Sequence, residues 1–359
     1  MTKITLYTPE LGGGGAQKTI QLIGRVLYNL NYDVSIVYNH EDQRYTSKLA
    51  SPYCNYIELN SSRTLFSIPK LFIFLIRSRP RFVLSTQPHA SIAIGLIIVV
   101  LQFFFKIELI CREANLQKEE KKVSKLYIYV LRKVAVQILA LSDDAKNDLL
   151  EFGVQKNKIT VVPNIVQCSD KIENINKIHS IDAEYTIAFI GRFDEMKGIF
   201  QTIVALKSYD PKAPVLNLHV FGDGPLHLRI HEETKKLGKN VKIHFYGWVD
   251  NAFSMLTSDI PLIVPSRYEP FGHIYLEACC YGVPIIARDG RGGSRDVVKN
   301  FDVGITYQSD EELILMIHDF RNTILKAKEK LINRDKVLDY FSNKNITKKY
   351  SRFMEILDG

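Results

Sequence analysis

Residues 259–287, DIPLIVPSRYEPFGHIYLEACCYGVPIIA, decide the fold class of this chain. An apolar run at Ile260–Val264 is followed by a polar loop, a helical pattern over Gly272–Tyr281 and a second apolar run at Pro284–Ala287. A proline ahead of the helical pattern and a glycine after it are typical of helix ends. Short buried strands joined by a helix predict an α/β fold with a parallel sheet.

The same alternation runs through both halves of the chain. Further strands are predicted at Ile4–Thr8, Val34–Tyr38, Phe82–Ser85, Leu109–Cys111, Gln137–Leu141, Lys158–Val162, Thr186–Ile190, Val215–Phe221 and Val241–Phe245. Helical patterns fall at Ala16–Leu30, Ile199–Lys207 and Leu226–Leu237. At 359 residues the chain exceeds one ordinary domain.

We therefore expect two Rossmann-like domains that face each other across a cleft. The N-terminal domain spans 1–168, a polar linker spans 169–184, and the C-terminal domain spans 185–336. A basic amphipathic helix at 337–359 is expected to pack back towards the N-terminal domain. Ligands of such sheets bind at the carboxyl ends of the strands, which would line the cleft.

The charge and cysteine content of the chain indicate which classes of partner and which compartment are expected. A net charge of +8 predicts an anionic partner, but the cations are spread along the chain and no zinc-finger spacing occurs, which disfavours nucleic acid. Five cysteines without a CxxC pair favour a reducing compartment. The start of the chain does not resemble a signal peptide. These observations predict a cytoplasmic protein.

Two apolar segments bear on membrane association. Ile92–Phe105 is too short to span a bilayer and predicts a buried or interfacial helix. Residues 67–81 are apolar with a basic end, so this segment can lie on anionic lipid or form a core helix with a solvated end. Peripheral binding at the inner face of the cytoplasmic membrane is therefore an open alternative.

The glycine run Gly12–Gly15 lies between the first predicted strand and the first predicted helix, where backbone amides can approach an anion. Lys18-Thr19 brings it near a phosphate-binding loop, but Gln17 stands where that motif requires glycine. A dinucleotide fingerprint would need glycine or alanine at Gln17 or Lys18. A turn without a ligand is the alternative.

Arg192 and Lys197 lie in the segment Gly191–Gly198, directly after a predicted strand. Two cations on one short loop at a strand end suit a diphosphate, because arginine can bind two oxygens at once. Two solvated surface cations are the alternative interpretation.

The loop and helix after Val264 carry the other candidates. A helix that starts near Gly272 leaves the amides of residues 271–273 able to bind a phosphate or sugar oxygen, with Glu269 just before them. Glu277 lies in an otherwise apolar helix, where an unpaired carboxylate is costly. Two ribose hydroxyls would satisfy it, and so would an internal salt bridge.

The motifs GGGGAQK, GRFDEMKG, FGDGP, FYGWVDN and PSRYEPFGHIYLEACCYGVPIIARDGRGG together resemble glycosyltransferase family 4, which has the GT-B fold. The resemblance is dense in the C-terminal half and thin in the N-terminal half. Its hallmark is the pair of glutamates Glu269 and Glu277. It implies a retaining enzyme that moves a hexosyl group from a nucleotide diphosphate sugar, expected to be a UDP-sugar, to a glycan or lipid-linked acceptor in cell-surface polysaccharide synthesis.

The resemblance also implies residue roles. The donor would contact Gly14, Gly15, Arg192, Lys197, Val249, Ser266, Glu269, Phe271, Gly272, His273 and Glu277, and the catalytic residues would be Glu269, Arg192 and Lys197. Glu277 would hold the ribose, and Val249 would border the nucleobase. The N-terminal domain would bind the acceptor, with His89 and Arg112 as candidates, and the C-terminal domain would bind the nucleotide sugar. No cofactor or metal is implied, in agreement with a sequence that lacks any DxD pair.

Three other functions stay open at this point. A nucleotide-sugar epimerase or a phosphorylase can have the same fold, and would act without an acceptor or require inorganic phosphate. A non-catalytic nucleotide-sugar-binding protein is the third. The intact set of Arg192, Lys197, Glu269 and Glu277 argues against it.

Overall fold

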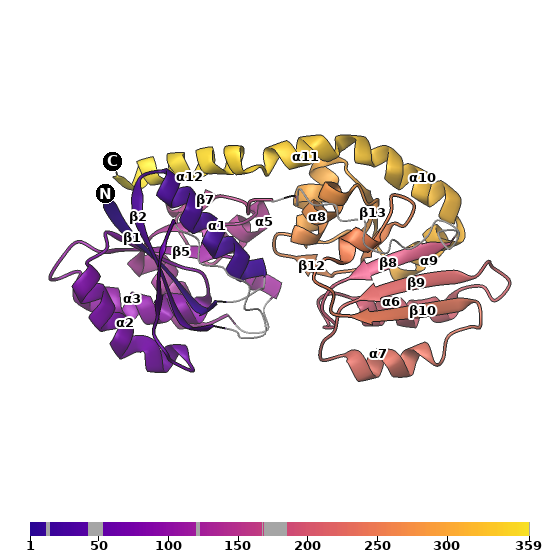
Figure 1. Cartoon of the computed structure of the whole chain (residues 1–359), viewed down its shortest axis with the longest axis horizontal. Coiled ribbons are helices and arrows are strands. Elements are labelled where there is room, and N and C mark those ends of the chain that lie inside the picture. Colours follow the sequence, from indigo (N-terminus) through magenta and orange to yellow (C-terminus); the bar gives the residue numbers. More distant parts are fainter. Residues whose placement is uncertain (12–14, 42–52, 120–122, 167, 169–184, 359) are drawn as a thin grey trace. The chain divides into compact units, whose positions relative to one another are not determined.

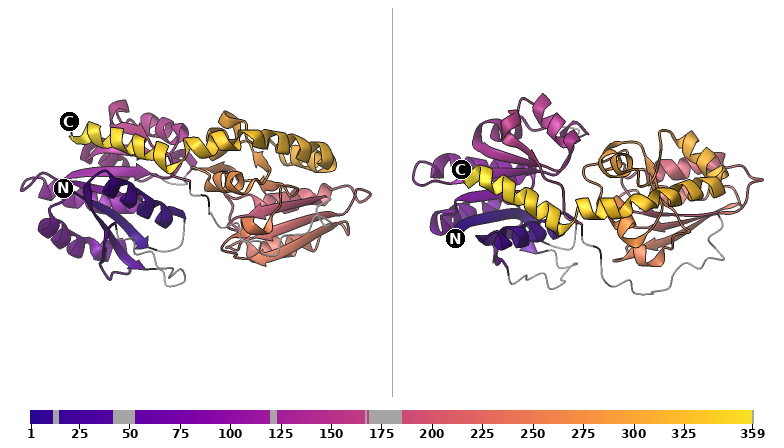
Figure 2. Two further views of the ribbon diagram at one scale, coloured as in Figure 1. Left: turned by 45° about the horizontal axis from the view of Figure 1, so that its top comes forward. Right: turned by 90° about the horizontal axis from the view of Figure 1, so that it is seen from above.

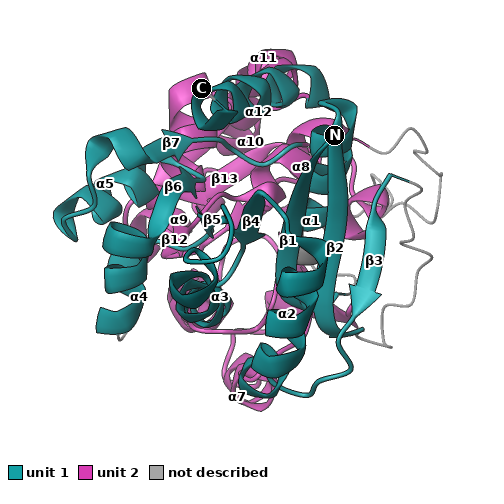
Figure 3. Cartoon of the chain, turned by 90° about the vertical axis from the view of Figure 1, so that its left-hand side faces the viewer, with its two compact units in different colours: residues 1–165, 343–359 teal, residues 166–342 magenta. Residues whose placement is uncertain are grey.

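The computed structural model describes residues 1–11, 15–41, 53–119, 123–166, 168 and 185–358 (Figure 1). The chain divides into two compact units, residues 1–165 with 343–359 and residues 166–342 (Figure 3). Each unit is built on a parallel sheet with helices, so the predicted fold of two parallel α/β domains is confirmed. The predicted linker, 169–184, and Gly14 lie outside the described residues. The cleft between the domains stays a prediction.

Unit 1 holds a seven-stranded sheet in the order β3-β2-β1-β4-β5-β6-β7. Its strands are β1 (Thr2–Leu11), β2 (Tyr32–Glu41), β3 (Asn55–Glu58), β4 (Phe82–Ser85), β5 (Glu108–Glu113), β6 (Ala135–Ala140) and β7 (Ile159–Val161). Neighbouring strands pair in parallel, for example Ile4 with Val34 and Phe82. The strands are rich in branched apolar residues because a parallel sheet is buried on both faces.

The helices of unit 1 cover the two faces of this sheet. They are α1 (Gly15–Asn29), α2 (Thr64–Ser78), α3 (Pro88–Leu101), α4 (Lys125–Tyr129), α5 (Asp143–Glu151) and α12 (Asn343–Asp358), with short turns of helix at Gln117–Glu119, Val130–Val134 and Lys156–Lys158. The apolar segment at 92–105 forms α3 and the turn after it. Among the described residues, no helix is both long and apolar enough to cross a bilayer.

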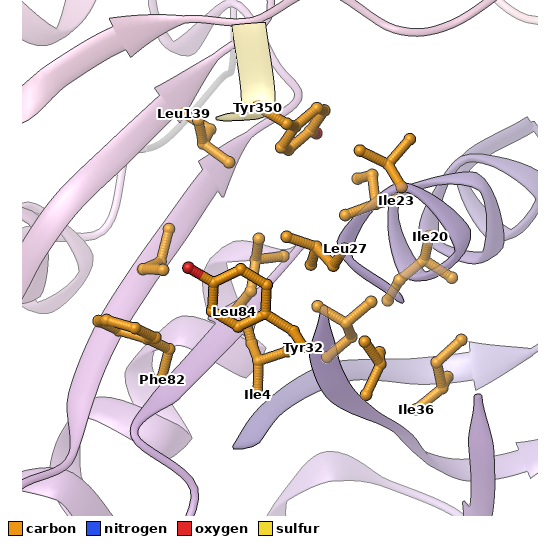
Figure 4. Close-up of a cluster of buried hydrophobic side chains, with 14 of the residues drawn as sticks. Ile4, Ile20, Ile23, Leu27, Tyr32, Ile36, Phe82, Leu84, Leu139 and Tyr350 are labelled. Atoms are coloured by element: carbon orange, nitrogen blue, oxygen red, sulfur yellow. The ribbon is translucent and has the colours of Figure 1, made fainter. Parts of the chain in front are cut away.

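The helices α1 and α12 pack on one face of the sheet of unit 1. Ile346, Tyr350 and Phe353 of α12 share a buried cluster with Ile20 of α1 and Ile4 of β1 (Figure 4). In every view α12 lies beside the strands near the N-terminus (Figure 2). The chain end therefore completes the core of the N-terminal unit.

The helices α2 and α3 lie side by side on the other face (Figure 3). Along β1, Tyr7 points to the face opposite to that of Ile4 and Leu6, which belong to the cluster with α1 and α12. The Tyr7 hydroxyl lies 2.9 Å from the Ser67 hydroxyl of α2, within hydrogen-bond distance. Ser91 of α3 bonds Ser85 of β4 at 2.6 Å. Successive strand residues point to opposite faces, so both layers are anchored to the same strands.

Unit 2 holds a six-stranded parallel sheet in the order β10-β9-β8-β11-β13-β15 and a two-stranded sheet of β12 and β14. The strands are β8 (Thr186–Ile190), β9 (Leu216–Phe221), β10 (Val241–Gly247), β11 (Leu262–Val264), β12 (Tyr268–Glu269), β13 (Ile285–Arg288), β14 (Arg291–Gly292) and β15 (Ile305–Tyr307). The helices are α6 (Ile199–Ala205), α7 (His227–Thr234), α8 (His273–Tyr281), α9 (Asp310–His318), α10 (Phe320–Lys330) and α11 (Arg334–Tyr340). Short helical turns lie at Leu206–Ser208, Ala252–Met255, Ser294–Lys299 and Leu331–Asn333.

The predicted C-terminal helix is two helices. A break at residues 341–342 separates α11, which belongs to unit 2, from α12, which belongs to unit 1. The first unit ends at Ile165, three residues before the predicted boundary. The sequence did not predict the short strands β3 and β15, which have four and three residues.

Candidate functional site

The candidate site lies where the strand order of unit 2 reverses. The neighbours β8 and β11 pair in parallel at Ala188 and Leu262, and the chain continues from β8 to one side of the sheet and from β11 to the other. The two loops that leave such a pair of strands diverge, and the crevice outside their carboxyl ends is where open α/β sheets bind ligands. Arg192 and Lys197 follow β8, and Glu269 follows β11.

The two loops touch each other directly. Gly198 has φ of 74°, and a Cβ atom at this position would lie 2.1 Å from the carbonyl oxygen of Pro265. The backbone N–H of Arg267 donates to the carbonyl of Met196 at 3.0 Å. A residue with a side chain could not occupy position 198 without moving the second loop, so this glycine sets how closely the loops approach.

The cations after β8 differ in their surroundings. The Arg192 side chain is 67% exposed, and its Nε lies 3.9 Å from Asp194 Oδ2. Asp194 Oδ1 accepts the backbone N–H of Lys197 at 3.0 Å, which folds the loop back between the two cations. An exposed guanidinium with only a distant partner can bind an anion at little desolvation cost.

Lys197, Ser266 and Glu269 form a compact polar cluster. Glu269 Oε1 accepts hydrogen bonds from Lys197 Nζ at 2.5 Å and from Ser266 Oγ at 2.7 Å. The Glu269 side chain is 7% exposed and that of Lys197 is 22% exposed. Charge-assisted bonds of this kind fix a carboxylate in place. The structure thus brings three predicted site residues together, with Lys197 bound to Glu269.

The backbone of Glu269 is held from the other side by β14. Glu269 pairs with Gly292, whose φ is 78°, and a Cβ atom at position 292 would lie 2.0 Å from the carbonyl oxygen of Glu269. A Cβ atom at Gly293 would lie 2.3 Å from the carbonyl oxygen of Phe271. The two adjacent glycines let the turn after β13 pack directly on the segment that carries the carboxylate.

The start of α8 faces the same segment. Gly272 has φ of 83° and precedes the helix, and as a glycine it has no side chain with which to cap it. Phe271 and Gly272 are buried, and the ring of His273 lies 5.1 Å from that of Phe271. Tyr275 is fully buried, and this burial together with the nearby Glu269 carboxylate raises its pKa well above the usual value. A helix start favours an anion.

The burial predicted for Glu277 is wrong. Its neighbours Tyr275, Leu276 and Ala278 are buried, but Glu277 itself is exposed. Successive helix residues are turned by 100°, so one polar residue can leave an otherwise apolar run. Glu277 shares its helix face with His273, four residues earlier. The cost of a buried carboxylate therefore gives no argument for its role.

The remaining donor-side candidates are placed as follows. Val249 follows β10 and is partly buried, beside Trp248, whose side chain is 60% exposed. Gly15 is the first residue of α1, and Gly14 lies outside the described residues. None of these positions carries a described contact with the Lys197–Glu269 cluster, so their roles stay predictions.

The two acceptor-side candidates differ. His89 is exposed in the first turn of α3. Arg112 is 4% exposed, donates a hydrogen bond to Asn164 Oδ1 and lies against Tyr350 of α12. Burial lowers the pKa of Arg112. The guanidinium of Arg112 is part of the core of unit 1, and its role on the acceptor side stays a prediction.

The expectation of a reducing compartment rested on the absence of a CxxC pair, but the cysteines do include a disulfide. Cys168 and Cys280 form a disulfide within unit 2, while Cys54, Cys111 and Cys279 are free. Cys280 lies on α8, three residues after Glu277. The adjacent pair Cys279-Cys280 gave no spacing from which a partner 112 residues away could be inferred. Cysteine usage therefore does not support a reducing compartment.

Two family descriptions match the chain. Residues 13–170 match "Glycosyltransferase Family 4" and residues 170–334 match "Glycosyl transferases group 1". Each half of the chain is thus similar to a glycosyltransferase family. The first match lies in the N-terminal part of unit 1, and the second lies in unit 2, which carries the Lys197–Glu269 cluster.

Several curated relatives of the chain carry names that refer to polysaccharide biosynthesis or to a cps region. An uncharacterized 41.2 kDa protein in the cps region of Klebsiella pneumoniae is 31% identical over 243 residues, which are 65% of this chain. The match spans 60% of the length of that relative. The capsular polysaccharide biosynthesis glycosyltransferase CapM of Staphylococcus aureus is 25% identical over 343 residues, 89% of this chain and 87% of CapM.

A solved structure confirms the GT-B fold. HepE of Anabaena, in complex with UDP and glucose, matches 99% of this chain and 100% of its own with a TM-score of 0.77. Its sequence is 14% identical, so the likeness shows the fold alone. In the part of the chain that the structure describes, no group of three or more His, Cys, Asp or Glu side chains is arranged to hold a metal.

Proposed function

We propose that this protein is a retaining glycosyltransferase that moves a hexosyl group from a UDP-sugar to a glycan or lipid-linked acceptor. The relatives with printed roles act in capsule, lipopolysaccharide and amylovoran biosynthesis, which supports a product at the cell surface. We place the reaction in the cytoplasm. Neither a cofactor nor a metal takes part in this proposal.

One observation carries the proposal: a buried carboxylate, which precedes a helix start with glycine at its N-cap, is held by a cation whose loop also carries an exposed arginine. Glu269, Lys197 and Arg192 belong to the two loops that flank the switch point of the sheet of unit 2. A nucleotide sugar has two chemically different parts at its reacting end: a negatively charged diphosphate and the neutral sugar attached to it. Cations and helix amides suit the diphosphate, and a carboxylate that is fixed in place suits the hydroxyl groups of the sugar.

In this proposal Arg192 and the amides of residues 271–273 bind the diphosphate and stabilise the nucleoside diphosphate as its bond to the sugar breaks. Glu269 contacts the transferred sugar, and its position is set by Lys197 and Ser266. We assign Glu269 no covalent role. Lys197 contributes positive charge to the diphosphate while it remains bound to Glu269, and Glu277 holds the ribose from the exposed face of α8.

Donor binding tests the site directly. Thermal unfolding of the full chain is measured with UDP-, GDP- and ADP-sugars, and a UDP-sugar at about 100 times its Kd is expected to stabilise the protein by roughly 2.7 kcal/mol. Arg192→Ala should weaken donor binding about tenfold or more, because charged hydrogen bonds are lost. Arg229→Ala is the matched control, since Arg229 on α7 is similarly exposed at 57%. No stabilisation by any nucleotide sugar would overturn the proposal.

Product analysis separates the alternatives. A transferase consumes the donor only when an acceptor glycan is present, whereas an epimerase converts the donor alone and a phosphorylase needs inorganic phosphate. The anomeric configuration of the product, determined by NMR, tests retention. Unchanged turnover in EDTA is expected from a metal-independent reaction, and a loss that Mg²⁺ restores would contradict it.

A further inference from the structure

An apolar stripe on α3 faces away from the core of unit 1. Leu96, Val99, Val100 and Phe103 are spaced by three, one and three residues, which places them on one side of a helix. They are exposed, and Phe103 and Phe104 in the turn after α3 are 81% and 78% exposed. Among them only Gln102, in the same turn, is polar. Leaving this much apolar surface in water is unfavourable, and such surfaces mark interaction sites.

The neighbouring helix α2 extends this surface. Phe66, Ile73 and Ile76 are 62%, 49% and 40% exposed and lie on the side of α2 away from the buried Leu71 and Leu75. The two helices contact each other on one face of the sheet (Figures 1 and 3). At their C-terminal ends Arg79 lies over the ring of Phe105, 6.0 Å from its centre. We call this surface, formed by the exposed apolar residues of α2, α3 and the turn after α3, the α2–α3 face.

The segment of the chain that forms the α2–α3 face carries positive charges only. Between Glu58 and Glu108 the sequence has no acidic residue, and it carries six cations against a net charge of +8 for the whole chain. The six are Arg63, Lys70, Arg77, Arg79, Arg81 and Lys106. Arg77 and Lys106 are exposed near the ends of α2 and α3, whereas Arg81 is paired with Glu108. The stretch of chain that carries the exposed apolar side chains is therefore basic, and Arg77, Arg79 and Lys106 lie near the ends of its two helices.

We propose that the α2–α3 face docks on an anionic lipid surface. Apolar side chains can enter the boundary between headgroups and acyl chains while Arg77 and Lys106 reach the lipid phosphates. A second copy of the chain is a poorer occupant, because a symmetric contact would set the same cations against each other. Nucleic acid offers the negative charge but no layer that would take up Phe103 and Phe104. The face is separate from the donor site in unit 2.

Vesicle sedimentation tests the proposal with the full chain. Vesicles of phosphatidylcholine with about 30% phosphatidylglycerol are compared with phosphatidylcholine alone, and the protein is expected to bind the anionic vesicles roughly tenfold better or more. The double variant Phe103→Ser/Phe104→Ser should lose about tenfold or more of this binding. Arg77→Glu/Lys106→Glu should lose a similar factor, and added salt should weaken binding of the wild type.

Two controls match these variants. Leu315→Ser/Ile332→Ser removes apolar side chains that are 67% and 83% exposed on unit 2, and Lys344→Glu/Lys348→Glu reverses two exposed cations on α12. Both should bind vesicles as the wild type does. All variants should keep the wild-type thermal midpoint, because their side chains are exposed.

The proposal is overturned if the wild type ignores lipid charge, or if both α2–α3 variants bind anionic vesicles as well as the controls do. A lipid-free dimer that Phe103→Ser/Phe104→Ser dissociates would assign the face to a second copy instead. Vesicle binding needs neither donor nor acceptor. The docking surface can therefore fail while the proposed transferase activity stands, and the reverse.

Discussion

At the scale of single residues, the carboxylate of Glu269 is held in place by two side chains. One of its oxygens accepts two hydrogen bonds, from an ammonium group and a hydroxyl, while the group is almost excluded from solvent. A buried carboxylate is tolerated only with such partners. Removing Lys197 would therefore leave an uncompensated charge, and the stability of unit 2 should report this directly.

We expect strong coupling between Lys197 and Glu269. Lys197→Ala should lower the free energy of unfolding by roughly 2–4 kcal/mol, Glu269→Gln should recover part of this loss, and the coupling energy should be about 1–3 kcal/mol. Chemical denaturation of the two single variants and the double variant measures it.

The pair Lys330–Asp302 provides the control, since its atoms are 2.6 Å apart but its side chains are 38% and 60% exposed. Its coupling should be at most about 0.5 kcal/mol because solvent screens it. Equal coupling in both cycles would mean that Lys197 is not needed to hold the carboxylate.

At the scale of elements, glycines decide how the loops of the site pack. Gly292 combines φ of 78° with an approach that leaves no space for a Cβ atom beside the Glu269 carbonyl. Gly247 has a similar φ of 66°, but a Cβ atom there would meet nothing within 4 Å. Alanine substitutions at these two positions therefore distinguish the cost of backbone strain from the cost of a steric clash.

Gly247→Ala should cost about 1 kcal/mol, the strain of a left-handed residue alone. Gly292→Ala should cost several kcal/mol more and weaken donor binding, because the turn must move away from β12. Thermal unfolding and donor titration of both variants test this. If the two alanine variants lose the same stability, the contact at Glu269 can open without cost.

The sequence predicted the elements of the site better than the environment of its side chains. The run 259–287 has apolar strands, a helix start and a glycine stop, and the β11-α8-β13 unit forms there. Local pattern cannot tell which residue of a short helix points outward, so Glu277 was expected to be buried. Arg112 was placed on a loop because its partners Asn164 and Tyr350 lie 52 and 238 residues further along the chain, where no local signal reaches.

At the scale of the whole molecule, the disulfide ties distant parts of unit 2 together. Cys168 and Cys280 are 112 residues apart, and closing a loop of this length restricts the unfolded chain. Cys280→Ser should lower the free energy of unfolding by about 2–5 kcal/mol in the absence of reductant. The difference should vanish in dithiothreitol.

Thiol counting provides an independent check of the disulfide. The denatured protein should show three thiols before reduction and five after it. In the folded state burial raises the pKa of Cys111 and of Cys279 to about 12 each, so these two should not react at pH 8. Five thiols without reduction would mean that the pair is open in the protein as isolated.

The C-terminal helix makes the fold of unit 1 depend on the last residues of the chain. Phe353 is 1% exposed and packs with α1 and β1, and Tyr350 contacts the buried Arg112. Phe353→Ala should therefore destabilise unit 1 by about 3–5 kcal/mol, as truncation of a large core side chain does. Lys348→Ala, on the exposed side of α12, should change stability by no more than about 0.5 kcal/mol.

Native-state hydrogen exchange can assign the loss to a unit. Amides of β1 and β4 should lose protection in Phe353→Ala, while those of β8 and β11 should keep it, because the two cores are separate. Loss of protection spread equally over both units would instead mean that they unfold together and that α12 stabilises the whole molecule.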